Sequence, residues 1–205
     1  SGENCECTVL NNVFRGAIGI GIVAEQGAEG IVRNNNSSQN RGGGMGTETN
    51  GNAIFENNSS FEDRGPGIVC TNGGKGTFRN HEVDRGVTSG CVISTGAEPD
   101  IEDCFFNSCG VHGIDIRHGA LGILKNCSAT ENTIGGLQFS GECKTKVENF
   151  KTFSNKTQGV CVGENAICYL ENCEARNQPI GIKFYASGQS VVTNCTIVDN
   201  ECGAV

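Results

Sequence analysis

Two of the three histidines in this chain flank one short segment, Val111-His112-Gly113-Ile114-Asp115-Ile116-Arg117-His118-Gly119. If this segment is a strand, alternation places Asp115 and Arg117 on one face and leaves both histidines in the flanking turns. An imidazole exchanges a proton near neutral pH, and a guanidinium neutralises a carboxylate. The chemistry that these groups could perform is proton abstraction next to the carboxylate of a sugar.

We expect any ligand site on this face to centre on His112, Asp115, Arg117 and His118, with Gln138 and Ser94 beside them on adjacent repeats. The site should bind rather than catalyse, because an exposed strand without walls cannot exclude water or preorganise a transition state. We therefore assign no catalytic residue. The sequence also predicts no metal site and no cofactor.

The elements that position these residues follow from a repeat that runs through nearly the whole chain. Glycines recur every 23 residues and then at 22, at Gly21, Gly44, Gly67, Gly90, Gly113, Gly136, Gly159, Gly181 and Gly203. Thirteen residues after each of the first eight glycines stands an asparagine or its isostere, at Asn34, Asn57, Asn80, Asp103, Asn126, Asn149, Asn172 and Asn194. A repeat of roughly 20–50 residues indicates a solenoid, whose units bury their apolar faces against one another.

The residue types within the repeat indicate strands. Apolar, variable and apolar residues follow the glycines, as in Gly113-Ile114-Asp115-Ile116 and Gly136-Leu137-Gln138-Phe139. This period of two predicts a short strand with one buried face, and helical spacing is nowhere sustained. We predict an all-β fold, a right-handed parallel β-helix with about 8–9 coils of 22–23 residues, its hand set by the preference of parallel crossovers.

Stacking of the coils predicts ladders of like side chains. We expect the asparagine column to point inward and to pass hydrogen bonds along the axis, with Asp103 as a weak point. The column after it should be interior, at Asn35, Asn58, His81, Cys104, Cys127, Phe150, Cys173 and Cys195. The column before it alternates in charge and should form an exposed ladder, at Arg33, Glu56, Arg79, Glu102, Lys125, Glu148, Glu171 and Thr193.

The repeat resembles the right-handed parallel β-helix family, which includes pectate lyases, alginate epimerases, NosD-like periplasmic proteins and F-box proteins with a β-helical recognition domain. The resemblance covers roughly residues 7–205 and includes the Asn-Cys turns at Asn126-Cys127, Asn172-Cys173 and Asn194-Cys195. It implies the fold, whereas activity must be argued from a site.

One segment is similar to the Tyr-Gly-Ile-Asp-Pro-His-Asp signature of alginate epimerases. Gly113, Ile114 and Asp115 match it. His112, Ile116, Arg117 and His118 replace its tyrosine, proline, histidine and final aspartate, so the resemblance does not carry over the catalytic part.

The composition of the chain limits the classes of partner and the number of domains that we expect. The formal net charge of −8 disfavours nucleic acid and anionic membranes as partners. Residues 1–205 are predicted to form one β-helix domain, with no apolar run near the roughly 20 residues of a membrane span. Because the chain stops where a new strand would open, at Gly203-Ala204-Val205, we expect a segment of a longer protein or end-to-end association.

The thirteen cysteines indicate whether the protein belongs in a reducing or an oxidising cellular compartment. Most fall in columns held elsewhere by Ile, Val, Thr or Ala, which favours small buried core residues and a reducing compartment, cytoplasmic or nuclear. Disulfides of an extracellular protein remain an alternative, because Cys104 and Cys127 would stack as neighbours. A zinc site is disfavoured, since only Cys5 and Cys7 are close in sequence.

These observations favour a non-enzymatic interaction scaffold or substrate-recognition module with a protein partner. The alternative is a carbohydrate-binding or polysaccharide-modifying β-helix of the lyase or epimerase kind. Such a protein should have outward aromatic platforms, paired acids and long loops around a groove. For such platforms the chain offers only two tyrosines, Tyr169 and Tyr185, and no tryptophan. Its coils of 22 or 23 residues contain no insertion that could build the wall of a groove.

Overall fold

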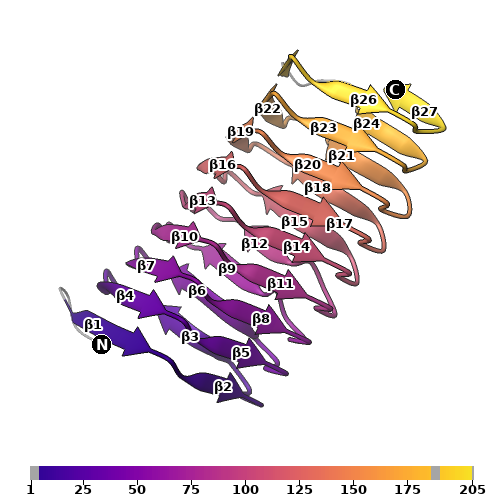
Figure 1. Ribbon diagram of the computed structural model, residues 1–205. Coiled ribbons are helices and arrows are strands. Elements are labelled where there is room, and N and C mark those ends of the chain that lie inside the picture. Colours follow the sequence, from indigo (N-terminus) through magenta and orange to yellow (C-terminus); the bar gives the residue numbers. More distant parts are fainter. Residues whose placement is uncertain (1–4, 186–189, 205) are drawn as a thin grey trace.

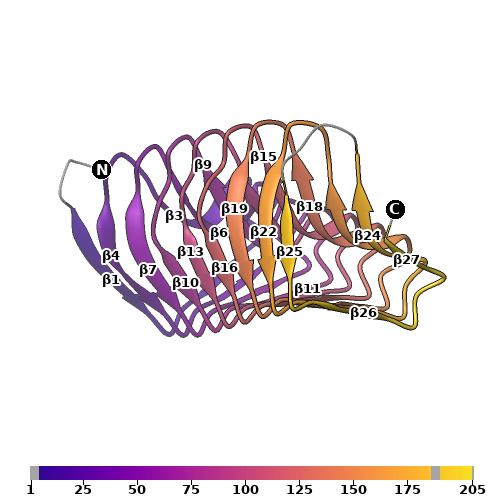
Figure 2. The same ribbon diagram turned by 90° about the horizontal axis from the view of Figure 1, so that it is seen from above.

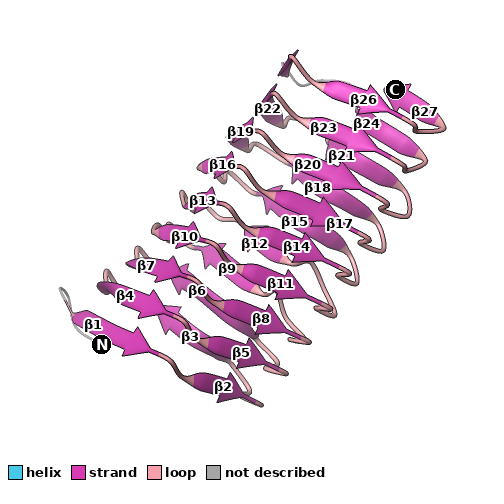
Figure 3. Cartoon of the chain, in the orientation of Figure 1, coloured by secondary structure: helices cyan, strands magenta, loops and turns pink. Residues whose placement is uncertain are grey.

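The computed structural model describes residues 5–185 and 190–204, in which all regular elements are strands (Figure 3). The strands form three parallel sheets of nine strands each, here called A, B and C. Successive strands pass from A to B to C, and the chain then begins the next coil (Figure 1). The prediction of an all-β parallel β-helix is confirmed.

Sheet A forms one long face of the solenoid, with its strands side by side (Figure 2). Its strands are β1 (Glu6–Leu10), β4 (Glu29–Arg33), β7 (Asn52–Glu56), β10 (Thr77–Arg79), β13 (Asp100–Glu102), β16 (Ile123–Lys125), β19 (Lys144–Glu148), β22 (Ile167–Glu171) and β25 (Val191–Thr193).

Sheet B follows sheet A after a one-residue left-handed bend and uses shorter strands. They are β2 (Val13–Arg15), β5 (Asn36–Ser38), β8 (Ser59–Phe61), β11 (Glu82–Asp84), β14 (Phe105–Asn107), β17 (Ser128–Thr130), β20 (Lys151–Phe153), β23 (Glu174–Arg176) and β26 (Thr196–Val198).

Sheet C closes each coil. Its strands are β3 (Ile20–Ala24), β6 (Gly43–Glu48), β9 (Ile68–Thr71), β12 (Cys91–Ile93), β15 (His112–Arg117), β18 (Gly135–Ser140), β21 (Gln158–Val162), β24 (Ile180–Phe184) and β27 (Cys202–Ala204).

The register of the sheets reproduces the sequence repeat. Cys91 pairs with Ile68 on one side and with Ile114 on the other, each 23 residues away. The core therefore consists of columns. One such column from sheet A contains Phe55 and Phe78, both fully buried, whose rings stack with centroids 4.6 Å apart. Burial of each large apolar side chain contributes about 1.5–3 kcal/mol.

The repeated glycine reflects a close approach between sheets B and C. A Cβ atom at Gly113 would lie 2.4 Å from the Cβ of Ala129, and one at Gly136 would lie 2.1 Å from Thr152 Oγ1. The backbone at these glycines is not in the left-handed region. Space, rather than backbone conformation, therefore excludes a side chain from this column.

The asparagine column does not point inward, and our prediction of its face was wrong. Asn34 and Asn126 are exposed and have left-handed backbone, with φ of 56° and 54°. Their side chains form an exposed ladder, in which Asn149 Nδ2 donates to Asn126 Oδ1 at 2.9 Å. Asparagine is selected here because it tolerates the left-handed bend between sheets A and B.

Buried amide ladders lie in two other columns. One is the predicted interior column, where the Asn35 backbone N–H donates to Asn58 Oδ1 at 2.8 Å. The other lies in the turns between sheets B and C, where the Asn132 N–H donates to Asn155 Oδ1 at 3.0 Å. Asn155 Nδ2 in turn donates to the carbonyl oxygen of Ala129 at 3.2 Å. These amides satisfy turn backbone that burial separates from water.

Asp63 occupies an amide position in the second ladder. Its Oδ1 accepts hydrogen bonds from the Asn40 N–H and Nδ2, at 2.8 and 3.0 Å. Its Oδ2 is buried without a partner. Burial raises the pKa of this carboxyl, although the hydrogen bonds from Asn40 oppose the shift. The protonated form therefore suits the site better than the carboxylate.

We expect Asp63→Asn to raise the free energy of unfolding at pH 7 by about 1–3 kcal/mol, because the amide needs no buried charge. The folded-state pKa lies above the unfolded one, so the contribution of Asp63 to stability is complete below about pH 4 and is lost as the pH rises. Denaturant titrations should show the difference between the two proteins shrinking toward pH 4. Asp103→Asn, an exposed control, should change stability by less than about 0.5 kcal/mol. A destabilised Asp63→Asn protein would contradict this assignment.

The exposed and buried asparagines should respond differently to substitution. Asn155→Ala should cost about 1–3 kcal/mol by leaving buried backbone unpaired. Asn126→Ala should cost about 1 kcal/mol through strain at positive φ, and Asn126→Gly should recover most of that loss. Equal losses for alanine and glycine at position 126, measured by urea unfolding, would exclude backbone strain as the cause.

All thirteen cysteines lie in the described part of the chain and are free. Most are buried, which confirms their role as small core residues, whereas Cys5 and Cys7 are exposed. Burial raises the pKa of the Cys70 and Cys109 thiols to about 12. Because the thiolate is the reactive form, the buried thiols should be inert in the folded protein.

Thiol labelling of the native protein should therefore modify Cys5 and Cys7 first and reach the buried cysteines only on unfolding. The melting temperature should not change when a reductant is added. A large fall in melting temperature with reductant would show that disulfides stabilise the protein.

Candidate functional site

The predicted site residues lie on the outer side of sheet C. Asp115 and Arg117 point outward from β15, and Arg117 Nη1 lies 3.4 Å from Asp115 Oδ2. The Asp115 side chain is only 14% exposed. Across the sheet, Asp115 pairs with Val92 on β12 and with Gln138 on β18. The structure therefore brings Asp115, Arg117 and Gln138 together on adjacent strands.

The two histidines lie at opposite ends of β15. His112 is half-buried, and its Nδ1 is buried without a hydrogen-bond partner. Burial lowers the pKa of His112, and the negative charge of Asp115 opposes this shift only in part. The neutral form of the imidazole is therefore more favoured here than in a free histidine. His118 is exposed, with φ of 54° in the turn after the strand.

Ser94 and Gln138 are already engaged within the fold. The Ser94 hydroxyl donates to Thr71 Oγ1 at 3.2 Å, and Ser94 is 8% exposed. Gln138 Nε2 donates to the carbonyl oxygen of Phe139 at 2.8 Å. The predicted patch is thus partly paired within the fold, although His112 Nδ1 and Arg117 Nε have no hydrogen-bond partner. Its role as a ligand site stays a prediction.

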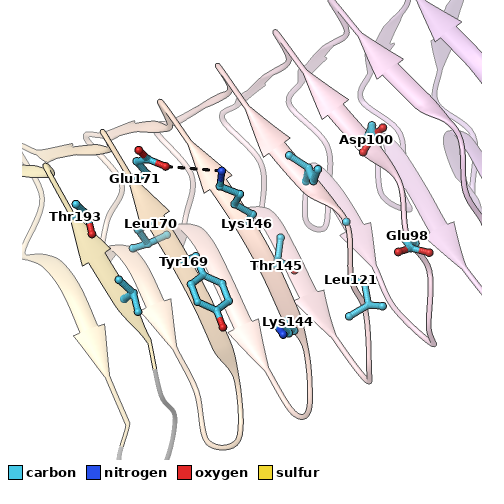
Figure 4. A pocket seen from close by; sticks show the side chains of 13 residues that line it. Glu98, Asp100, Leu121, Lys144, Thr145, Lys146, Tyr169, Leu170, Glu171 and Thr193 are labelled. Atoms are coloured by element: carbon cyan, nitrogen blue, oxygen red, sulfur yellow. Dashed lines mark ion pairs between the residues drawn. The ribbon is translucent and has the colours of Figure 1, made fainter.

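A cavity that the sequence reasoning missed lies on the outer face of sheet A. It has a volume of about 640 Å³ and spans β13, β16, β19, β22 and β25. One residue from each strand forms its floor, in the order Asp100, Ile123, Lys146, Tyr169 and Val191. Figure 4 shows Lys144 near the end of the Tyr169 side chain and Lys146 directed toward Glu171.

Apolar side chains and paired charges share this cavity. Leu121 and Ile123 are 38% and 44% exposed. Lys146 forms ion pairs with Glu148 and with Glu171, the latter at 3.8 Å (Figure 4). The contact with Glu148 raises the pKa of Lys146 and lowers that of Glu148. Both groups are therefore fully charged at neutral pH.

Lys144 has a different environment. Its ammonium lies 5.9 Å from the centre of the Tyr169 ring. No ion pair between described residues includes Lys144, Glu98 or Asp100, although all three line the cavity. Unpaired charges of both signs are thus available here to a ligand.

Further hollows continue along the same face toward the N-terminus. A cavity of about 550 Å³ has Thr8, Ile31, Ile54 and Thr77 in its floor, and a smaller one of about 180 Å³ includes Thr77 and Asp100. Together they form one trough along the solenoid axis, here called the sheet A trough. Its signal in the sequence is the residue before each interior apolar residue of sheet A, which is often Ile, Tyr or Val.

The described residues hold no group of three or more His, Cys, Asp or Glu that could bind a metal ion. Their structure likewise includes no helix long and apolar enough to span a membrane.

Comparison with known proteins agrees with this architecture. The model of a family described as "Right handed beta helix region" matches residues 1–152 and 135–205. The chain therefore belongs to the right-handed β-helix family, as its repeat predicted. A search of curated proteins found no match.

Proposed function

We propose that this protein is a non-enzymatic binding module that docks an extended segment of a partner protein in the sheet A trough. The observation that carries the proposal is the set of exposed apolar side chains in the floor of the trough, namely Ile123, Tyr169 and Val191. Exposed apolar groups framed by charged side chains are typical of protein interaction sites.

The shape of the trough suits an extended chain. The floor presents one side chain per coil, about 4.8 Å apart, along a line that crosses β13 to β25. A peptide that lies along this line contacts several coils at once. Leu121 and Ile123 would take its apolar side chains, while Lys144 and Asp100 would fix its direction through opposite charges.

The electrostatics of the trough favour binding over catalysis. General acid–base catalysis needs a group whose pKa lies near the working pH. The ion pair with Glu148 instead raises the pKa of Lys146 and lowers that of Glu148, so both move away from neutrality. On sheet C, the Arg117 guanidinium lies beside the Asp115 carboxylate, which competes with an incoming anion for it.

Carbohydrate binding is the second candidate, and the ring of Tyr169 supports it. This side chain is 37% exposed in the trough, beside the Lys144 ammonium. An exposed aromatic ring offers an apolar platform with a polar tip. Lys144 could bind a sugar carboxylate at the same time.

A displayed library of random peptides tests the protein-binding proposal. Selection on the wild-type protein should enrich peptides that lose at least about tenfold in affinity, or about 1.4 kcal/mol, when Ile123→Asp or Tyr169→Ala is introduced. Phe105→Ala, which removes an exposed aromatic ring from sheet B, is the matched control and should leave binding unchanged.

A glycan array and an activity screen on uronate polymers test the alternative. Glycan binding that Tyr169→Ala abolishes, without any peptide enrichment, would assign the trough to carbohydrate. Turnover that disappears in Asp115→Ala would overturn the non-enzymatic proposal and make the sheet C patch an active site.

A further inference from the structure

A cluster of arginines lies where sheet B turns toward sheet C. Arg15 ends β2, and Arg41 and Arg64 lie in the turns of the next two coils. The three side chains line a cavity of about 540 Å³ with Gln39, Glu62 and Val87. We call this cavity the arginine corner. It is a local positive site on a chain whose formal net charge is −8.

Glu62, the only acid among the described residues that lines the arginine corner, already has partners. Glu62 Oε2 accepts a hydrogen bond from Gln39 Nε2 at 3.2 Å, and Glu62 Oε1 lies 4.0 Å from Arg85 Nη1. Arg15 donates two hydrogen bonds to Gln39 Oε1, at 3.0 and 2.8 Å. These contacts form a continuous side-chain network that runs from Arg15 through Gln39 and Glu62 to Arg85.

Arg41 and Arg64 take no part in this side-chain network. Both are exposed, and no hydrogen bond or ion pair of their side chains occurs among the described residues. Their backbones stack in register, since the Arg41 N–H donates to Ala17 O and the Arg64 N–H to Asn40 O, both at 2.8 Å. Like charges stacked on adjacent coils repel one another, as they do on neighbouring strands, and an anion held between them would offset the repulsion.

The residue after each of the two arginines has no side chain. A glycine follows each of them, and a Cβ at Gly42 would lie 2.6 Å from the carbonyl carbon of Gly19. A Cβ at Gly65 would lie 2.3 Å from the carbonyl oxygen of Gly42. Close stacking of the coils thus keeps both positions free of a side chain.

We propose that the arginine corner binds a phosphate monoester carried by an extended segment of a protein. Three arginines and one glutamate give the cavity a formal charge of +2. A phosphate monoester carries about −1.5 to −2 at pH 7 and offers three acceptor oxygens. The planar guanidinium forks of Arg41 and Arg64 can each bind two of these oxygens. A sulfate ester, with a single negative charge, matches the cavity less well.

The flanks of the arginine column specify the segment that carries the phosphate. Ile18 and Val87 lie one coil beyond Arg41 and Arg64 and are 81% and 61% exposed. Three coil spacings separate Ile18 from Val87, or about 14 Å. In an extended peptide, the side chains two residues before and two residues after a central residue are also about 14 Å apart. The preferred ligand is therefore a phosphorylated residue with an apolar residue two positions away on each side.

This inference goes beyond the proposed function, because the arginine corner lies between sheets B and C, whereas the trough lies on sheet A. Fluorescence anisotropy with a labelled peptide tests it directly. The peptide has phosphoserine at its centre and leucine two positions away on each side. It should bind at least about tenfold more tightly than its unphosphorylated form. The double variant Arg41→Gln/Arg64→Gln should lose this difference, while the double variant Ile123→Asp/Tyr169→Ala in the trough should keep it.

Two further comparisons sharpen the experiment. Binding of the phosphopeptide should weaken below about pH 6, where the phosphate takes up its second proton, whereas a sulfoserine peptide should bind weakly at every pH. Arg176→Gln, which removes an exposed arginine from sheet B, is the control and should not change affinity.

Three results would overturn the proposal. They are equal affinity for the phosphorylated and unphosphorylated peptides, an equal loss in Arg176→Gln, and tighter binding of a sulfated glycan fragment than of the phosphopeptide. Melting curves of each variant will show that it is folded, and the exposure of these arginines makes large losses of stability unexpected.

Discussion

Every other feature of this protein depends on the parallel stacking of each residue on its counterpart one coil away. Cys91 lies between Ile68 and Ile114 in this way, and Lys146 lies between Ile123 and Tyr169. The environment of a side chain is therefore set mainly by its own column. A substitution that suits its column leaves the coil intact, whereas one that conflicts with it affects two neighbours at once.

The column in which a polar group lies also determines whether it is hydrogen-bonded, ion-paired or kept neutral. Inside, amides such as Asn132 and Asn155 pass hydrogen bonds from coil to coil and leave few buried groups unpaired. Outside, charges pair along the sheet, as Arg79 does with Glu102 at 3.3 Å. Buried titratable groups are driven toward their neutral forms: burial lowers the pKa of His81 to about 3 and raises that of Asp63. The unpaired charges that remain lie on the outer surface of the solenoid, as those of Arg41 and Arg64 do.

The sequence predicted the fold because a period of 23 residues survives any uncertainty about single residues. It did not predict the face of Asn34, because a left-handed bend and a buried ladder both select asparagine. It also missed the trough. An exposed Ile123 beside a buried Leu124 differs from a core pair only once the orientation of the strand is known. The sequence could not show that Arg41 lacks an ion-pair partner either, since this depends on the contacts of Glu62 with Gln39 and Arg85.

The glycine near the start of each strand of sheet C limits how the length of a coil can change. The last coils have 22 residues instead of 23 and still keep the register, since Val160 pairs with Ile182 and Ile182 with Ala204. Because Gly113 and Gly136 admit no Cβ, a loss or gain that shifts these glycines out of register would move a side chain into a space that holds none. Loss or gain of a whole coil would return every column to its place. Such a chain can therefore change length by duplication or deletion of complete coils, each of which alters the trough by one floor residue and about 4.8 Å. Its outer surface can thus be extended without any redesign of its core.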